Sequence, residues 1–114
     1  MSDRELLELA AKAADIKVEW REWRTARAAE FGLIKHTKHA GFWVGGQQWD
    51  PLIDDGDALR LAVKLLFEID MGRGNIAVRH ATGIKILEAF NHNPNDAARR
   101  AIVRAAAEIG RAMP

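Results

Sequence analysis

Apolar residues recur at helical spacing in three segments of the 114-residue chain, at 3–14, 54–69 and 94–112. The apolar stripe on the second segment is the widest, because Leu59 and Leu66 add to it, so we expect that helix at the centre of the core. The stripe on the third segment consists mostly of alanines, which lets a helix pack close to its neighbour. The pattern therefore predicts three helices.

Each of these segments also begins with residues that start helices. Ser2 and Glu5 match the S-x-x-E capping box, which satisfies two backbone donors at a helix start. Asn93 can cap the last segment, and the proline that follows it suits the first helical position. Asp54 or Asp55 can cap the middle one. The helix starts are thus predicted by side-chain chemistry as well as by periodicity.

Alternating apolar and polar residues predict strands at 16–23, 75–80 and 84–90. The last two are separated by Ala-Thr-Gly, a spacing typical of a β-hairpin. Residues 31–37 and 41–45 are expected to pair as a hairpin or a pair of loops. Three strands are therefore expected, and five if residues 31–37 and 41–45 form a hairpin.

The length and the order of these elements predict the architecture. A chain of 114 residues suits a single domain, residues 1–114. Helices and an antiparallel sheet bury their apolar faces by packing in layers. We therefore expect an α+β fold, a three-layer α/β/α sandwich with a mostly antiparallel sheet, about three helices and helices on both sides of the sheet.

Composition argues against several classes of active site. The chain has no cysteine, a single serine interpreted as a helix cap, and no phosphate loop or dinucleotide motif. Its formal net charge of +1 gives no global attraction to nucleic acid or membrane. No apolar run is long enough to span a bilayer. We expect a cytoplasmic protein that is not an enzyme and that holds no cofactor.

Two groups of residues could in principle bind a metal ion. His36 and His39 lie three apart, but in a strand or loop this spacing turns them to opposite faces. The acidic run at 54–57 lacks the alternating ligands and the distal glutamate of a calcium loop. We interpret the run as a helix start that follows a loop anchored by Trp49, and no metal site is predicted.

Three blocks of the sequence are similar to a known family. They are 3–14, 49–65 and 98–110, and the middle block, from Trp49 to Leu65, is the most specific. In this order they resemble small uncharacterised phage and prophage proteins with a phage α/β/α (ABA) sandwich domain, although Asp50 stands where an asparagine is usual. The resemblance implies a layered α/β fold and a phage or prophage setting in a bacterial host. It brings no activity and no catalytic residue.

The segment 17–38 mixes basic and aromatic residues. Its basic residues are Lys17, Arg21, Arg24, Arg27, Lys35 and Lys38, and its aromatic residues are Trp20, Trp23 and Phe31. Basic side chains contact phosphates and aromatic rings stack on bases, so one hypothesis is a nucleic-acid-binding face. The alternative is a strand with one buried tryptophan and a solvated charged side.

Four tryptophans in so small a chain favour protein–protein interaction, because tryptophan and arginine are enriched at interface hot spots. Trp43 lies near glycines and is expected either at an exposed loop or sheet edge or in the core. Self-association through the alanine-rich helix or a strand edge is equally open. The predicted interaction surface comprises Trp20, Arg21, Trp23, Arg24, Arg27 and Trp43.

The sequence therefore favours an accessory protein that acts by binding a protein partner of the host or the phage. Interference with host machinery or defence is the most concrete form of this function. The alternative is a small nucleic-acid-binding protein that uses the segment 17–38.

Overall fold

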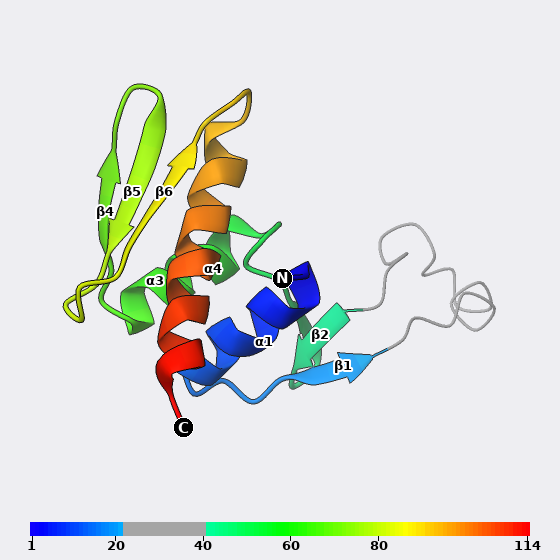
Figure 1. Cartoon of the computed structure of the whole chain (residues 1–114). Helices are drawn as coiled ribbons and strands as arrows, with labels where there is room; N and C mark the ends of the chain where they lie inside the picture. Colours follow the sequence, from blue (N-terminus) through cyan, green and yellow to red (C-terminus); the bar gives the residue numbers. More distant parts are fainter. Residues whose placement is uncertain (22–40) are drawn as a thin grey trace, which may run out of the picture. The chain divides into compact units, whose positions relative to one another are not determined.

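The computed structural model describes residues 1–21 and 41–114. They belong to two compact units (Figure 1). The helical unit comprises Met1–Lys17 and Asp50–Pro114, and the strand unit lies within Val18–Trp49. The predicted strand at 31–37 falls outside the described residues.

The three helices of the helical unit begin where the caps predict. They are α1 (Asp3–Ala13), α3 (Asp55–Lys64) and α4 (Pro94–Ala112). Ser2, Asp54 and Asn93 are the N-caps, and the side chain of each accepts a backbone N–H three residues later at 2.8–3.1 Å. These contacts satisfy amide groups that a helix start leaves without a partner. The predicted helix starts are confirmed.

The middle helix ends earlier than the apolar pattern predicts. Leu66 takes a left-handed backbone with φ 56°, and the N–H of Phe67 donates to the carbonyl oxygen of Ala62 at 3.0 Å. This geometry closes a helix in the way that glycine usually allows. The prediction of a helix through residue 69 was wrong, because nothing in the local sequence marks Leu66 as a stop.

The residues that follow form a three-stranded antiparallel sheet in the order β4-β5-β6. Its strands are β4 (Glu68–Met71), β5 (Asn75–Arg79) and β6 (Lys85–Ala89). The pairing of β5 with β6 confirms the predicted hairpin, whereas Glu68 and Ile69 of β4 were predicted as the end of a helix. Ile76 and Val78 on the middle strand are fully buried.

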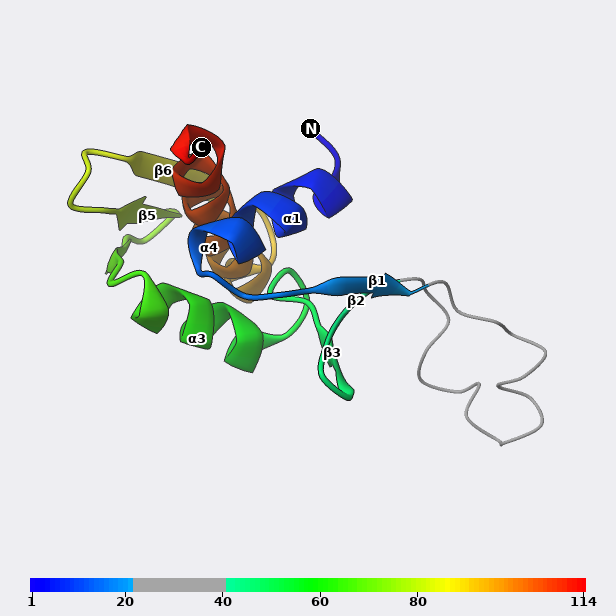
Figure 2. The same ribbon diagram turned by 90° about the horizontal axis from the view of Figure 1, so that it is seen from below.

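Helix α4 is the central element of the helical unit. It lies between the sheet β4-β5-β6 and α1, and α3 packs against it as well (Figures 1 and 2). Buried residues occupy most of its circumference, including Ala101, Val103, Ala105 and Ala106 with no exposed surface. The expectation that the middle helix would be central was wrong, because small side chains let neighbours approach α4 from several sides.

The contact between α1 and α4 is close enough to involve backbone atoms. A Cβ atom added to the buried Gly110 would lie 2.0 Å from the carbonyl oxygen of Leu9. On the α1 side, Ala10, Ala11 and Ala14 are buried and equally small. Hydrogen in place of a side chain at 110 therefore sets how closely the two helices pack.

The strand unit contains a second three-stranded antiparallel sheet, in the order β1-β2-β3. Its strands are β1 (Glu19–Arg21), β2 (Gly41–Val44) and β3 (Gln47–Trp49). The first two confirm the strands predicted at 16–23 and 41–45. Strand β3 was not predicted, because Trp49 was assigned to a loop. The α+β class, the three helices and the antiparallel pairing are confirmed.

We predict that Gly110→Ala lowers the free energy of unfolding by about 2 kcal/mol. Overpacking a backbone contact costs about 3 kcal/mol, and this exceeds the gain of about 1 kcal/mol from replacing glycine inside a helix. Chemical denaturation measures the difference. Gly74→Ala is the control, because a Cβ there meets nothing within 4 Å; equal stability of the two variants would contradict the close contact.

Candidate functional site

The sheet β1-β2-β3 has an aromatic face. Cross-strand register aligns Trp20, Phe42 and Trp49 in one row. Phe42 and Trp49 are buried, and Trp20 is half-buried with its ring 4.9 Å from that of Phe42 in an edge-to-face arrangement. Aromatic pairs of this geometry stabilise a sheet beyond the area they bury. This row therefore belongs to the packing of the strands.

The opposite face of the same sheet carries a charged and aromatic cluster. The guanidinium carbon of Arg21 lies 5.1 Å from the ring centroid of Trp43, within the range of a cation–π interaction. Arg21 also pairs with Glu19 at 3.1 Å, and both charged side chains are exposed while Trp43 is half-buried. We call Glu19, Arg21 and Trp43 the Arg–Trp face.

The residues of the predicted interaction surface thus have different positions. Arg21 and Trp43 come together, and Trp20 is turned to the other face of the sheet because side chains alternate along a strand. Trp23, Arg24 and Arg27 lie outside the described residues, as do the paired histidines. Among the described residues of the predicted surface, Arg21 and Trp43 are therefore the two that lie together, and both belong to the Arg–Trp face.

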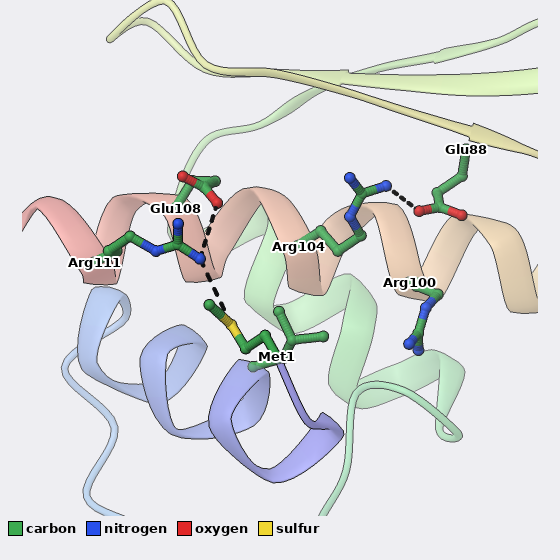
Figure 3. A pocket seen from close by; sticks show the side chains of 7 residues that line it. Met1, Glu88, Arg100, Arg104, Glu108 and Arg111 are labelled. Carbon is green, nitrogen blue, oxygen red and sulfur yellow. Dashed lines mark hydrogen bonds and ion pairs between the residues drawn. The ribbon is translucent and has the colours of Figure 1, made fainter.

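A polar pocket of about 390 Å³ lies beside α4 in the helical unit (Figure 3). Its lining residues are Met1, Leu6, Glu88, Arg100, Arg104, Glu108 and Arg111. Figure 3 shows that the arginines and Glu108 project from successive turns of α4, while Glu88 enters from β6. The sequence pattern placed these arginines away from the apolar face but gave no sign of a pocket.

Each guanidinium group in this pocket has a carboxylate partner. Arg100 bonds to Asp3 at 3.1 Å, Arg104 bonds to Glu88, and Arg111 lies 3.5 Å from Glu108. An anionic ligand would have to displace these carboxylates. The first two pairs connect α4 to the start of α1 and to β6, so we assign them a structural role.

An exposed apolar row runs along α3. Leu59 and Val63 are 61% and 64% exposed and lie one turn apart on one side of the helix, and Leu66, which is 84% exposed, follows the end of the helix. The side that packs on α4 consists of Ala58, Leu61 and Ala62. We call Leu59, Val63 and Leu66 the α3 row. The expectation that Leu59 and Leu66 belong to the core was wrong, because among the described elements only α4 makes extensive contact with α3.

The sequence contained a signal for this row that was misinterpreted. The apolar stripe of the middle segment is wider than one packing face requires, and a stripe of that width fits either a central helix or a helix with two apolar surfaces. Contiguous exposed apolar side chains in a protein mark interaction sites. The α3 row is therefore a second candidate surface.

The acidic run at the start of α3 is held by hydrogen bonds and ion pairs within the chain. Asp54 caps the helix, and Asp57 accepts the N–H of Asp50 at 3.0 Å while pairing with Arg60 at 2.8 Å. Arg99 on α4 reaches across to Asp55. The described residues contain no group of three or more side chains placed to hold a metal ion. The interpretation of this run as a helix start is confirmed.

Asp50, in the described part of the chain, is a carboxyl group whose environment shifts its pKa. Burial raises its pKa above the usual 3.8, and the negative charges of Asp3 and Asp57 raise it further. The backbone N–H of Leu52, which donates to Asp50 Oδ1 at 3.0 Å, and the amide of Ile53 oppose this shift. Shifted pKa values often mark active sites, but here the carboxyl group accepts a turn-forming backbone hydrogen bond.

No family model, curated protein or solved structure matches this chain. The resemblance to phage and prophage sandwich proteins therefore stays a prediction. None of the described helices has both the length and the hydropathy of a membrane span.

We predict that Asp50→Asn raises the free energy of unfolding at pH 7. The amide oxygen can still accept the Leu52 N–H, and the variant removes a charge that is costly to bury. The pKa of Asp50 is higher in the folded protein than in the unfolded chain. The free-energy cost of burying its charge is therefore full above the folded pKa, declines as the pH falls through that value, and vanishes below the unfolded pKa. The difference in the free energy of unfolding between Asp50→Asn and the unchanged protein should depend on pH in the same way.

Denaturation at a series of pH values measures this difference. Asp70→Asn on β4 provides the control, because Asp70 is exposed and only a surface ion pair to Arg79 is removed. An advantage of Asp50→Asn that grows as the solution is acidified would contradict the raised pKa.

Proposed function

We propose that this protein acts by binding a protein partner through the Arg–Trp face. The proposal rests on the contact between the Arg21 guanidinium and the half-buried Trp43 ring, whose centroid lies 5.1 Å from the guanidinium carbon. Tryptophan and arginine are the residue types that contribute most at interface hot spots. Here they stand side by side on the face opposite to the aromatic row.

The geometry of this face favours binding in two ways. Buried Phe42 and Trp49 hold the strands from behind, so Trp43 projects from a packed sheet. Arg21 is held by the ring on one side and by Glu19 on the other. Side chains that are ordered before binding lose less conformational entropy when a partner arrives.

The charge of the face favours a protein over a nucleic acid. The carboxylate of Glu19 lies 3.1 Å from the guanidinium of Arg21 and would repel a phosphate there. A protein surface can satisfy both groups at once, with a donor for Glu19 and a carbonyl or carboxylate for Arg21. Nucleic-acid binding by the segment 17–38 remains the alternative, and most of that segment lies outside the described residues.

The wider setting of this function follows from the sequence resemblance. The family resemblance suggests a phage or prophage accessory protein in the cytoplasm of a bacterial host, where the partner would belong to host machinery or defence. The absence of enzymatic activity also stays a prediction.

We predict that Trp43→Ala combined with Arg21→Ala weakens partner binding by about 2 kcal/mol or more, the usual cost of truncating a hot spot. Affinity capture from a bacterial lysate, quantified by mass spectrometry, compares the variant with the unchanged protein. Val44→Thr is the matched control, because Val44 is also exposed but alternates to the other face. A partner retained equally by all three proteins would contradict the assigned face.

The nucleic-acid alternative requires a separate measurement. Fluorescence anisotropy with labelled single-stranded and duplex oligonucleotides should show no binding at low salt. Binding that weakens as salt increases and is lost in Arg21→Ala would favour the alternative over the protein partner.

A further inference from the structure

We infer that this chain cleaves its own backbone between Asp50 and Pro51 in mildly acidic solution, with the side chain of Asp50 as the attacking group. This bond is the one Asp–Pro bond in the sequence. The inference goes beyond the proposed function, because the reaction involves none of the residues of the Arg–Trp face. Three features of the turn favour it: the leaving group, the position of the carboxyl group, and the hydrogen bonds to the carbonyl oxygen.

The reaction has two covalent steps. A carboxyl oxygen of Asp50 attacks the carbonyl carbon of the same residue and closes a five-membered ring, the bond to the Pro51 nitrogen breaks, and the carboxyl proton passes to that nitrogen. Proline is a favourable leaving group because its tertiary amide nitrogen is more basic than that of other peptide bonds. Water then opens the cyclic anhydride and leaves Asp50 with two carboxyl groups. The net change is the hydrolysis of one peptide bond.

The turn holds the carboxyl group of Asp50 close to this bond. Its Oδ1 atom accepts the N–H of Leu52 at 3.0 Å, and the hydrogen bond closes a ring of atoms that includes the Asp50–Pro51 peptide bond. The side chain of Pro51 is fully buried, so the turn is also fixed on the other side of the bond. Confining two reacting groups in this way lowers the entropy that is lost on reaching the transition state.

The carbonyl oxygen of Asp50 accepts two backbone hydrogen bonds. The N–H of Ile53 donates to it at 3.1 Å, and the N–H of Asp54 donates at 2.9 Å. Negative charge develops on this oxygen when the carboxyl group attacks the carbonyl carbon. Two donors that are already in place stabilise such a charge, as they do in an oxyanion hole.

The surroundings of Asp50 favour the protonated carboxyl group, which supplies the proton for the leaving nitrogen. Burial raises the pKa of Asp50, and the negative charges of Asp3 on α1 and Asp57 on α3 raise it further. The protonated form is therefore present at a higher pH in the folded protein than in the unfolded chain.

The arginines around this turn are engaged by other groups. Arg60 on α3 pairs with Asp57, Arg100 on α4 pairs with Asp3, and Arg99 on α4 donates to the carbonyl oxygen of Leu52. Among the described residues, none of these three arginines forms an ion pair with Asp50. The carboxyl group thus lacks a cation that would hold it ionised.

Cleavage changes how the two units are joined. The strand unit is connected to the helical unit at Lys17 and at Asp50, and only the connection at Lys17 survives the reaction. The two fragments stay associated, because α1 remains packed on α4 where Leu9 meets Gly110. The reaction therefore frees one end of the unit that carries the Arg–Trp face without dissociating the protein.

Incubation of the folded protein at a series of pH values from about 4 to about 8, above the ordinary pKa of aspartate, tests the reaction. Mass spectrometry under denaturing conditions should detect the fragments 1–50 and 51–114, formed faster as the pH falls. The same protein in concentrated urea gives the acid lability of an unstructured Asp–Pro bond, and the folded protein should exceed that rate on the order of tenfold. The absence of fragments, or a rate in urea that equals the folded rate, overturns the inference.

Two variants test the roles of the reacting groups. Asp50→Asn should abolish cleavage, because its amide is a weak nucleophile with no acidic proton, although it still accepts the Leu52 N–H and retains the turn. Pro51→Ala should slow cleavage because the leaving nitrogen is less basic. Asp70→Asn, at an exposed position on β4, is the control and should cleave at the unchanged rate. Fragments that form equally fast from Asp50→Asn overturn the inference.

The pH dependence tests the contribution of the fold. Asp3→Asn removes a negative charge that raises the pKa of Asp50, so the pH at which cleavage reaches half its maximal rate should fall. An unchanged pH dependence overturns the assignment of Asp50 as the source of the proton.

Hydroxylamine tests the intermediate, because it captures an anhydride as a hydroxamic acid. Fragment 1–50 formed in its presence should carry this group on Asp50, which tandem mass spectrometry locates. A fragment that ends in unmodified carboxyl groups overturns the anhydride route.

Discussion

The helical unit depends on the backbone contact between α1 and α4. Gly110 lies so close to the carbonyl of Leu9 that a single methyl group would force the helices apart. The alanines around this point allow the same approach along both helices. Because α1 packs so closely on one side of α4, the other sides of α4 remain available to the sheet and to α3. A core of this kind is stabilised by dense contact between small groups more than by large apolar side chains.

Charged side chains then connect the outer elements to this core. Arg99 donates to the carbonyl of Leu52 at 3.0 Å and to Asp55, so it holds the start of α3 against α4. Arg100 and Arg104 do the same for α1 and β6. The arginines of α4 thus act as structural links, which is why a pocket rich in arginine offers no guanidinium without a carboxylate partner.

The sequence predicted the features that depend on local chemistry. Ser2, Asp54 and Asn93 cap helices because their side chains reach amides three residues away, and that distance is encoded in the chain itself. The hairpin of β5 and β6 follows from alternation and a short turn. The predictions that were wrong concern features that depend on tertiary context. The end of α3 at Leu66 contradicts the preference of its residue type, and the exposure of Leu59 depends on how many elements cover one helix.

For the candidate surfaces too, the sequence indicated the residue types, whereas the fold determines which of them lie together. Arg21 and Trp43 were both selected from composition, but their contact depends on the register between β1 and β2. Trp20, selected on equal grounds, faces the other way. Residue type alone cannot distinguish the two tryptophans. The α3 row was visible in the sequence as apolar positions, yet periodicity reports that a face is apolar and not what covers it.

The left-handed Leu66 has a consequence for how this protein can diverge. A substitution at this position changes two things at once, the cost of the left-handed backbone and the apolar surface beside α3. Glycine lowers both, whereas a β-branched residue would raise the backbone cost. Position 66 therefore couples the place where α3 ends to the amount of apolar surface that the helical unit exposes.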